Sequence, residues 1–387
     1  MILDKQLISL EDCIQKLTTE KIQDDFINIV NINAIKNNYL FLRSRHIKGN
    51  CSAVVKSNAY GLGAKEIASA LNEVGCKDFF VSNLEEGVQL RETLSKNNNI
   101  YILYGPTINS LPLFVHYRLI PVLNYYAQVL LWDRFCKKIS RKLEAVIQFD
   151  TGMHRGGLDP NETQKLYLNF EKISFTIKYL MSHLSCSEIY NHPMNKQQNS
   201  DFKKIIQKFN NLPATLANSG GIFQGTEFHH ELLRPGAAIY GISPTPHKKN
   251  PMLPVLQSFA RIIQFHEIKK EQFVGYGLSY KTKRDSRIAM IGVGYAQGYP
   301  WGNQKGWCQL NSWKLPIVGN ISMNATLVDV TDVPSSEIRE GTMVQLIGPH
   351  ITLEQLSRQT KTISRDLLLR IANAGKKHYH ETKINNL

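Results

Sequence analysis

The sequence predicts an α/β fold, a (β/α)8 TIM barrel followed by a mainly β C-terminal domain. Strand-length apolar runs alternate with helix-length segments as far as about residue 250, roughly eight times over. Beyond Pro251 the helical spacing stops, and short β-type runs separated by turn residues follow. The chain has 387 residues, enough for a barrel of about 250 residues and a smaller domain. We therefore expect a polar N-terminal extension over residues 1–25, a barrel over 26–251 and a β-rich domain over 252–387.

The expected barrel strands are short runs rich in β-branched and aromatic residues. Helical patterns separate them. In residues 63–75, for example, Ile67, Leu71 and Val74 fall on one helical face. The barrel strands are expected at residues 26–30, 51–56, 78–82, 100–104, 119–123, 144–149, 175–183 and 214–218.

The C-terminal domain is expected to contain several strands and two short terminal helices. Its strand-length runs are bounded by Gly, Pro, Asn and Asp, which is typical of an all-β unit. The strands are expected within residues 258–268, 273–280, 287–296, 314–319, 325–330 and 342–348, and the helices at 352–359 and 364–373.

The net charge of +14 arises from 46 Lys and Arg residues against 32 Asp and Glu residues. Such a charge suits nucleic acid, a membrane surface or small anions. The sequence has no zinc-finger, helix-turn-helix or RNP-like string, so we expect no nucleic-acid partner. It also has no apolar run of about 18 residues and no secretory signal pattern, which predicts a cytoplasmic protein without a membrane span.

The six cysteines are scattered, without a C-x-x-C pair or a histidine at ligand spacing. We expect reduced packing residues and no metal site.

Lys56 closes the predicted strand that contains Ala53, Val54 and Val55. In a TIM barrel, side chains at the carboxyl ends of the strands line the active site. Burial lowers the pKa of a lysine, and the neutral amine can form a Schiff base. The alternative is a lysine at the barrel rim whose amine extends into water.

The residues around Lys56, AVVKSNAYGLG, resemble the pyridoxal 5'-phosphate (PLP) lysine motif of bacterial alanine racemases. Eight further strings resemble that family in the same order, and together the matches cover about residues 26–375. They are VNINAIKNNY, FDTGMHRGGL, LMSHLSC, LANSGG, LRPGAAIYG, VGYGLSY, IGVGYAQGYP and VGNISMN.

This resemblance implies an alanine racemase that interconverts L-alanine and D-alanine through a PLP aldimine and supplies D-alanine for peptidoglycan. Two bases exchange the α-proton, Lys56 on one face of Cα and Tyr276 on the other. In the family the tyrosine base comes from the partner subunit, so the resemblance implies a homodimer with shared active sites.

The resemblance also implies roles for the other matching residues. Arg234 would lie against the pyridine nitrogen, where a fixed cation disfavours ring protonation. Arg155 and the backbone of Met323 would bind the substrate carboxylate, and Tyr295 would line the substrate entrance. The residues implied to bind the cofactor are Lys56, Tyr60, His183, Asn218, Ser219, Arg234, Gly236 and Ala237.

Four positions depart from the family pattern. Gln148 stands where many members have a carbamylated lysine that holds the substrate arginine, and Asn324 replaces an aspartate. Both changes remove negative charge near Arg155. We hypothesise that a small anion such as chloride fills the space, and the alternative is reduced turnover or altered substrate preference. Leu62 interrupts a usual Gly-His-Gly, and Asn373 falls where many members have a tyrosine.

Several other functions remain to be distinguished. PLP decarboxylases with a barrel and a β domain place a glutamate at the pyridine nitrogen, which Arg234 argues against. A single-domain PLP carrier would lack the segment from residue 252 onward. A related racemase for serine or lysine, or a catalytically weakened paralogue, shares the same motifs and stays open.

Overall fold

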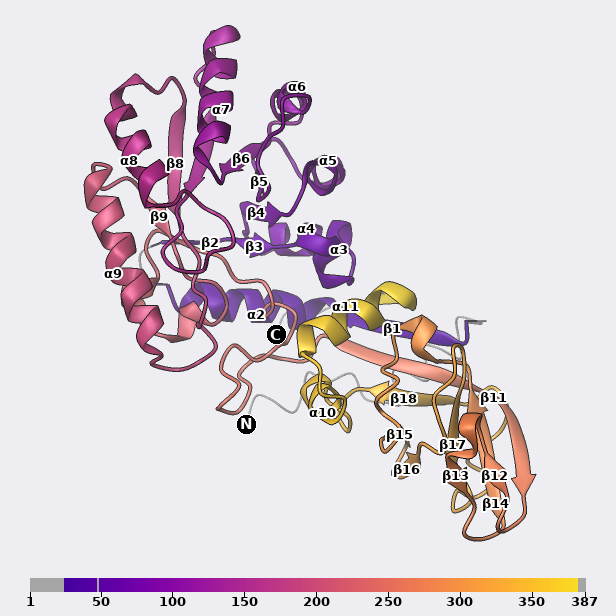
Figure 1. Ribbon diagram of the computed structural model, residues 1–387. Coiled ribbons are helices and arrows are strands. Elements are labelled where there is room, and N and C mark those ends of the chain that lie inside the picture. The colour runs from indigo at the N-terminus through magenta and orange to yellow at the C-terminus, as the bar shows by residue number, and fades with distance from the viewer. Residues whose placement is uncertain (1–23, 47–48, 382–387) are drawn as a thin grey trace, which may run out of the picture. The chain divides into compact units, whose positions relative to one another are not determined.

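A computed structural model describes residues 24–46 and 49–381 of the chain (Figure 1). The expected N-terminal extension therefore lies almost entirely outside the described residues. Cα packing divides the chain into two compact units. Of the described residues, one unit contains those within 35–59 and 63–253, and the other contains 24–34, 60–62 and 254–381. We refer to them as the barrel unit and the β-rich unit.

The barrel unit is built on a curled parallel sheet with the strand order β3-β4-β5-β6-β7-β8-β9. The sheet closes on itself through β10 (Leu232–Leu233), which pairs in parallel with β2 (Asn50–Cys51). A parallel bridge between Asn218 and Arg234 joins β10 to the segment after β9. The remaining strands are β3 (Ala53–Val54), β4 (Asp78–Val81), β5 (Asn99–Ile102), β6 (Ile120–Leu123), β7 (Glu144–Gln148), β8 (Thr176–Met181) and β9 (Ala214–Thr215).

Helices alternate with these strands and lie around the outside of the sheet (Figure 1). Several begin at side-chain caps: Asn83 accepts the N–H of Glu86, and Asp159 accepts the N–H of Glu162. The helices are α2 (Ile32–Ser44), α4 (Ala64–Glu73), α5 (Leu84–Thr93), α6 (Leu111–His116), α7 (Tyr126–Lys138), α8 (Pro160–Leu168) and α9 (Pro193–Lys208), with 3-10 turns η1 (Phe170–Lys172), η2 (Gly221–Phe223) and η3 (Thr226–Phe228). The short segment α3 (Lys56–Tyr60) has left-handed backbone angles and is a turn at a strand end.

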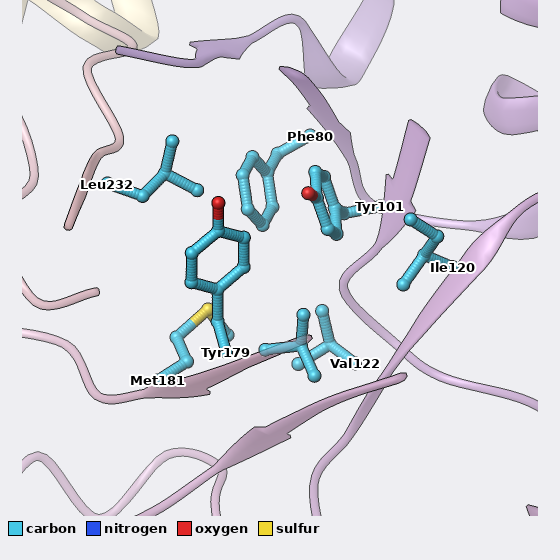
Figure 2. Packing of buried hydrophobic residues seen from close by; sticks show 8 residues of the cluster. Phe80, Tyr101, Ile120, Val122, Tyr179, Met181 and Leu232 are labelled. Atoms are coloured by element: carbon cyan, nitrogen blue, oxygen red, sulfur yellow. The ribbon is translucent and has the colours of Figure 1, made fainter. Parts of the chain in front are cut away.

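The interior of the barrel is filled by apolar and aromatic side chains that point toward one another (Figure 2). The rings of Phe80 and Tyr101 stack with their centroids 4.4 Å apart. The buried hydroxyl of Tyr101 donates to Asp78 at 2.8 Å, so the aromatic core also satisfies its polar atom. The interior is thus packed, and chemistry is left to the strand ends.

The β-rich unit is a mainly antiparallel sheet centred on the long strand β11 (Leu256–Ile268), which pairs with β1, β14 and β18. A strand that no expectation covered, β19 (Lys376–His380), pairs in parallel with β1. The other elements are β12 (Phe273–Val274), η4 (Tyr276–Leu278), β13 (Tyr280–Lys281), β14 (Ser286–Ile291), η5 (Tyr295–Gln297), β15 (Trp307–Leu310), β16 (Trp313–Pro316), β17 (Thr326–Asp329), β18 (Met343–Ile347), α10 (Leu353–Gln359) and α11 (Ser364–Ala374).

One strand assignment was wrong. Residues 26–30 were expected to form the first barrel strand, but β1 (Phe26–Asn31) pairs with β11 and β19 of the β-rich unit. The strand that completes the barrel is β10, only two residues long. The run 26–30 is buried throughout, and a continuously buried strand carries no alternation that would reveal which sheet it joins.

Five cysteines, Cys51, Cys76, Cys136, Cys186 and Cys308, are free thiols, while Cys13 lies outside the described residues. The described residues contain no group of three or more His, Cys, Asp or Glu side chains that could hold a metal ion. No helix within them is both long enough and apolar enough to cross a membrane.

Candidate active site

Lys56 follows strand β3 and begins a left-handed turn at the carboxyl end of the barrel. Ser57, Asn58, Ala59 and Tyr60 all have φ values between 52° and 57°. Each non-glycine residue in this conformation costs about 1–2 kcal/mol, so the turn must be held by its surroundings. The carboxylate of Glu86 accepts the N–H of Ser57 at 2.7 Å. Its second oxygen accepts the N–H of Ser82 at 2.8 Å, which ties the lysine turn to the end of β4.

Ser219 lies after β9, in a turn where Asn218 and Ser219 are half-buried and Gly220 is buried. Its hydroxyl accepts the N–H groups of Gly236 and Ala238, each at 3.1 Å. A Cβ on the neighbouring Gly220 would lie 2.6 Å from the carbonyl oxygen of Ser187, so only glycine fits there. Converging N–H groups with a serine hydroxyl are the donor set that phosphate groups bind.

Arg234 is a buried cation, 4% exposed, next to this turn. Its Nη1 donates to Thr215 Oγ1 at 2.5 Å and its Nη2 donates to the carbonyl of Ser182 at 2.6 Å. Among the described residues no carboxylate forms an ion pair with it, and burial lowers the pKa of its guanidinium to about 9. A buried cation without a counter-ion is costly unless an electron-rich group completes its surroundings.

His183 joins these parts of the barrel rim. Its Nδ1 lies 3.4 Å from Nη2 of Arg234, and its Nε2 lies 3.3 Å from Nδ2 of Asn218. The carbonyl oxygen of Asn218's side chain accepts the N–H of Gly221 at 3.0 Å. The barrel unit therefore carries these residues at one set of strand ends: Lys56, His183, Asn218, Ser219, Arg234, Gly236 and Ala237.

These residues fit PLP. The Ser219 turn offers phosphate donors, the glycine there leaves no space for a side chain, and Arg234 presents a cation that lacks a carboxylate partner. Lys56 would supply the amine for covalent attachment.

Arg155 lies in the loop from Asp150 to Leu158 that follows β7. The loop closes on itself, because the N–H of Asp150 donates to the carbonyl of Leu158 at 3.0 Å. One Asp150 oxygen accepts the N–H groups of Gly152, Met153 and His154. Burial acts to raise the pKa of Asp150, but the N–H groups of Gly152 and His154 and the His154 ring lower it below its usual value. The Arg155 side chain is exposed and pairs with no other described residue.

Gln148 does not contact Arg155 through a hydrogen bond. Its amide Nε2 donates to the carbonyl of Gly156 at 2.9 Å, one residue beyond the arginine. The position that departs from the family pattern thus holds the backbone of the arginine loop without any charge.

In the β-rich unit, Tyr276 lies on the turn η4, between glycines with positive φ values of 77° and 67°. Its side chain is 73% exposed, and its carbonyl accepts the side-chain N–H of Asn320 at 2.9 Å. An aromatic residue this exposed does not contribute to the core of its own chain. We had expected this tyrosine within a β strand. The positive φ values of the glycines on either side instead place it on a turn, where its ring is exposed.

Met323 and Tyr295 lie on two turns that hydrogen-bond to each other. The N–H of Tyr295 donates to the carbonyl of Ser322 at 3.2 Å, and the N–H of Ala296 donates to that of Met323 at 2.9 Å. The N–H of Met323 has no partner among the described residues. Asn324 accepts a hydrogen bond from Gln297 at 3.1 Å, so the neutral residue joins the same two turns.

Tyr60, Leu62 and Asn373 also belong to the β-rich unit. Leu62 is fully buried and its carbonyl accepts the hydroxyl of Tyr379 at 2.9 Å. The backbone of Asn373 lies against Gly61, where a Cβ would approach its nitrogen to 3.2 Å. The predicted site residues therefore fall into two groups, one on each unit.

Sequence reasoning missed the residues that hold the site residues in place: Glu86, Thr151, Ser182, Gln198 and Thr215. Only Glu86 carried a usable signal, since Asn83 followed by Glu86 is the pattern of a helix capping box. For a threonine in a strand or a glutamine in a helix, the local sequence does not show whether the side chain hydrogen-bonds to several site residues or to none.

Comparison with known proteins identifies the family. The family model "Alanine racemase, N-terminal domain" matches residues 30–244, and "Alanine racemase, C-terminal domain" matches residues 255–379. The chain belongs to the alanine racemase family. The family, fold class, enzyme class and cofactor predicted from the sequence are thereby confirmed.

Individual members of the alanine racemase family match over most of their length. A catabolic alanine racemase of Mesorhizobium japonicum is 38% identical over 90% of this chain and 92% of its own. An alanine racemase of Rickettsia africae is 39% identical over 90% of this chain and 98% of its own. A crystal structure of alanine racemase from Bartonella henselae, with covalently bound pyridoxal phosphate, is 40% identical with a TM-score of 0.86 and covers 92% of this chain and 100% of its own.

Proposed function

We propose that this chain is a cytoplasmic enzyme that interconverts L-alanine and D-alanine, with the D isomer used for peptidoglycan. The observation that carries the proposal is the buried Arg234, which pairs with no carboxylate in the described part of the chain, in the barrel that also bears Lys56. A cation at the pyridine nitrogen favours reversible proton transfer over decarboxylation. The relatives named above, all alanine racemases, support alanine as the substrate.

Each site residue has a defined task in this proposal. When bound, PLP would supply an electron sink that acidifies the proton on the substrate's Cα, and Lys56, which would hold the cofactor between turnovers, would then have a free amine. The Lys56 amine moves the proton at one face of Cα, and the Tyr276 hydroxyl moves it at the other. Arg155 and the unpaired N–H of Met323 bind the carboxylate, which orients Cα between the two bases.

The remaining residues hold the cofactor and shape access. Ser219, with the N–H groups around Gly236 and Ala237 and the hydroxyl of Tyr60, binds the phosphate. His183 and Asn218 support Arg234, and Tyr295 lines the entrance. None of these groups has to lose or gain a proton for its task.

We further propose that the working unit is a homodimer in which each site combines the Lys56 of one subunit with the partner's Tyr276. The β-rich unit exposes apolar side chains on the turns that carry its site residues, including Tyr276 at 73%, Leu278 at 60% and Met323 at 56%. The barrel unit exposes Tyr104 at 69% and Ile108 at 72% in the segment after β5. Such displayed apolar groups are typical of surfaces that bind a partner.

Activity is tested by incubating the purified protein with L-alanine and PLP and measuring D-alanine. Lys56→Ala and Tyr276→Phe should each abolish racemisation. Formation of the D isomer from another amino acid but not from alanine would reassign the substrate, and release of CO2 would reassign the reaction.

Shared sites are tested by subunit mixing. Two inactive variants, Lys56→Ala and Tyr276→Phe, are unfolded together and refolded. If the sites are shared, half of the dimers carry one intact site and the mixture recovers about one quarter of wild-type activity. If each chain contains a whole site, the mixture stays inactive and the dimer proposal is wrong.

A further inference from the structure

Gln198 is a fully buried amide on helix α9 with all of its hydrogen-bonding capacity used. Its Oε1 accepts the backbone N–H of Ser185 at 2.9 Å and the hydroxyl of Ser185 at 3.0 Å. Its Nε2 donates to the carbonyl of His183 at 2.9 Å and to Thr151 Oγ1 at 3.4 Å. A buried amide with four partners is far more constrained than a polar residue that is merely tolerated in a core.

The partners of Gln198 lie on the two strand-end loops that matter for the proposed chemistry. Thr151 begins the loop after β7 that carries Arg155. His183 and Ser185 begin the loop after β8, and the His183 ring contacts Arg234. The Gln198 side chain therefore bonds both to the loop that carries Arg155, the proposed substrate ligand, and to His183, which contacts the proposed cofactor residue Arg234.

A second set of contacts joins the same two loops without Gln198. The hydroxyls of Thr151 and Ser182 lie 2.7 Å apart, and that of Ser182 donates to the carbonyl of Phe149 at 2.9 Å. The backbone carbonyl of Ser182 accepts Nη2 of Arg234 at 2.6 Å. Thr151 and Ser182 are both buried, so this connection is shielded from water.

Helix α9 does not need Gln198 to stay attached to the barrel. Phe202 is fully buried on the same helix, and Asn195 and Asn199 bond other backbone segments. Asn195 donates to the carbonyls of Cys186 and Ile189, farther along the loop after β8. Only the amide of Gln198 reaches both Thr151 and His183 from this helix.

We propose that Gln198 is a positioning residue that locks the Arg155 loop and the His183–Arg234 pair into one arrangement. This proposal rests on the roles assigned to Arg155 and Arg234 in the proposed function. Loss of the amide frees the start of each loop and leaves the carbonyl of His183 and the hydroxyl of Thr151 without this partner. Substrate carboxylate binding and cofactor binding then weaken together.

The test compares Gln198→Met, which keeps the side-chain length, with Asn195→Leu, a matched control one turn away on the same helix. The purified proteins are compared by amide hydrogen exchange, by PLP affinity from cofactor absorbance, by KM and kcat for alanine, and by the thermal midpoint of unfolding. Gln198→Met should accelerate exchange in both residues 150–158 and residues 182–186, weaken PLP binding and raise KM by roughly tenfold or more. Asn195→Leu should accelerate exchange only around residues 186–192 and leave KM and PLP affinity near wild type.

The proposal is overturned if Gln198→Met lowers the thermal midpoint as Asn195→Leu does but changes neither exchange in 150–158 nor PLP affinity. Should Gln198→Met not fold, Thr151→Val removes the bonds from the Arg155 loop to Gln198 and Ser182 but keeps the bond from Gln198 to His183, so it should raise KM without changing PLP affinity. An unchanged KM in that variant overturns the proposal too. Exchange and PLP binding do not depend on turnover, so a wild-type protein that makes no D-alanine refutes the proposed function separately.

Discussion

The hydroxyl of Thr215 accepts a hydrogen bond from Nη1 of Arg234 at 2.5 Å and donates one to the carbonyl of Leu232 at 2.5 Å. Thr215 is fully buried, so water cannot replace it as an acceptor. A guanidinium whose pKa burial has already lowered to about 9 depends on each remaining acceptor to stay charged and fixed.

Thr215→Val should therefore destabilise the barrel by about 1.5–3 kcal/mol, because it leaves a buried charged donor unpaired in a nearly unchanged volume. Thr215→Ser keeps the hydroxyl and should cost far less. Denaturant unfolding of both variants measures the difference, and the absorbance of bound PLP reports whether Arg234 has moved. Equal stabilities for the valine and serine variants would show that this hydrogen bond contributes little.

Glu86 is expected to hold the strained turn after Lys56. A glutamine at this position has one acceptor oxygen and an NH2 group, so it cannot accept both the Ser57 and the Ser82 N–H groups. Glu86→Gln should cost about 1.5–3 kcal/mol of stability. It should also lower kcat, because the backbone next to Lys56 is then held less firmly and the proposed catalytic amine is positioned less precisely. Glu85→Gln, at the exposed neighbouring position, is the control and should behave as wild type in both the unfolding and the racemisation assay.

Gln148 should make the enzyme independent of bicarbonate. A glutamine cannot be carbamylated, and its amide already holds the carbonyl of Gly156 at 2.9 Å. Activity measured with and without added bicarbonate should be the same. Gln148→Leu removes this hydrogen bond. If the Arg155 loop binds the carboxylate as proposed, in both ground and transition states, this variant should raise KM for alanine by about tenfold and change kcat much less.

The chloride hypothesis for the same position is checked in the same assay. If a bound chloride takes the place of the missing negative charge near Arg155, replacing chloride with a large anion such as gluconate should raise KM. An unchanged KM would leave the hydrogen bond from Gln148 to Gly156 as the support of the loop.

The sequence predicted most of the elements because each run carried its own local signal. The C-terminal helices at 352–359 and 364–373, for example, appear as α10 (Leu353–Gln359) and α11 (Ser364–Ala374). Pairing between strands is a non-local property, which explains the wrong assignment of residues 26–30 and the unexpected β10 and β19. Two-residue strands such as β10 bury too few residues to show any periodicity.

The residues proposed to carry chemistry could be singled out from the sequence, whereas the residues that hydrogen-bond to them could not. Lys56, Arg155 and Arg234 stand within distinctive strings that resemble one family. Gln198 bonds to groups that are 13 to 47 positions away along the chain, and Thr215 bonds to groups that are 17 to 19 positions away. Nothing in the local sequence specifies such distances, so these residues become visible only when the fold brings their partners together.

His230 should make the protein lose stability in mildly acidic solution. Its Nε2 lies 3.1 Å from Oδ1 of Asn199, which can only accept, so the ring donates there. Burial, followed by the charges of Lys203 and Arg234, lowers the pKa of His230 to about 4. In the unfolded chain the pKa is about 6.5, so the unfolded state binds the proton first as the pH falls. The stability present above pH 6.5 is therefore lost progressively between about pH 6.5 and 4, and the loss levels off below that range.

The expected loss from His230 alone is about 2 kcal/mol, less than the full shift implies because the side chain is only half-buried. Urea unfolding of the wild type and of His230→Asn at several pH values from 7.5 to 4 measures it. Asparagine tolerates the left-handed backbone here, where φ is 50°. The variant should be less stable at pH 7.5 but should lose stability less steeply on acidification, whereas His266→Asn at an exposed position should keep the wild-type slope. Parallel curves for wild type and His230→Asn would assign the acid sensitivity to other groups.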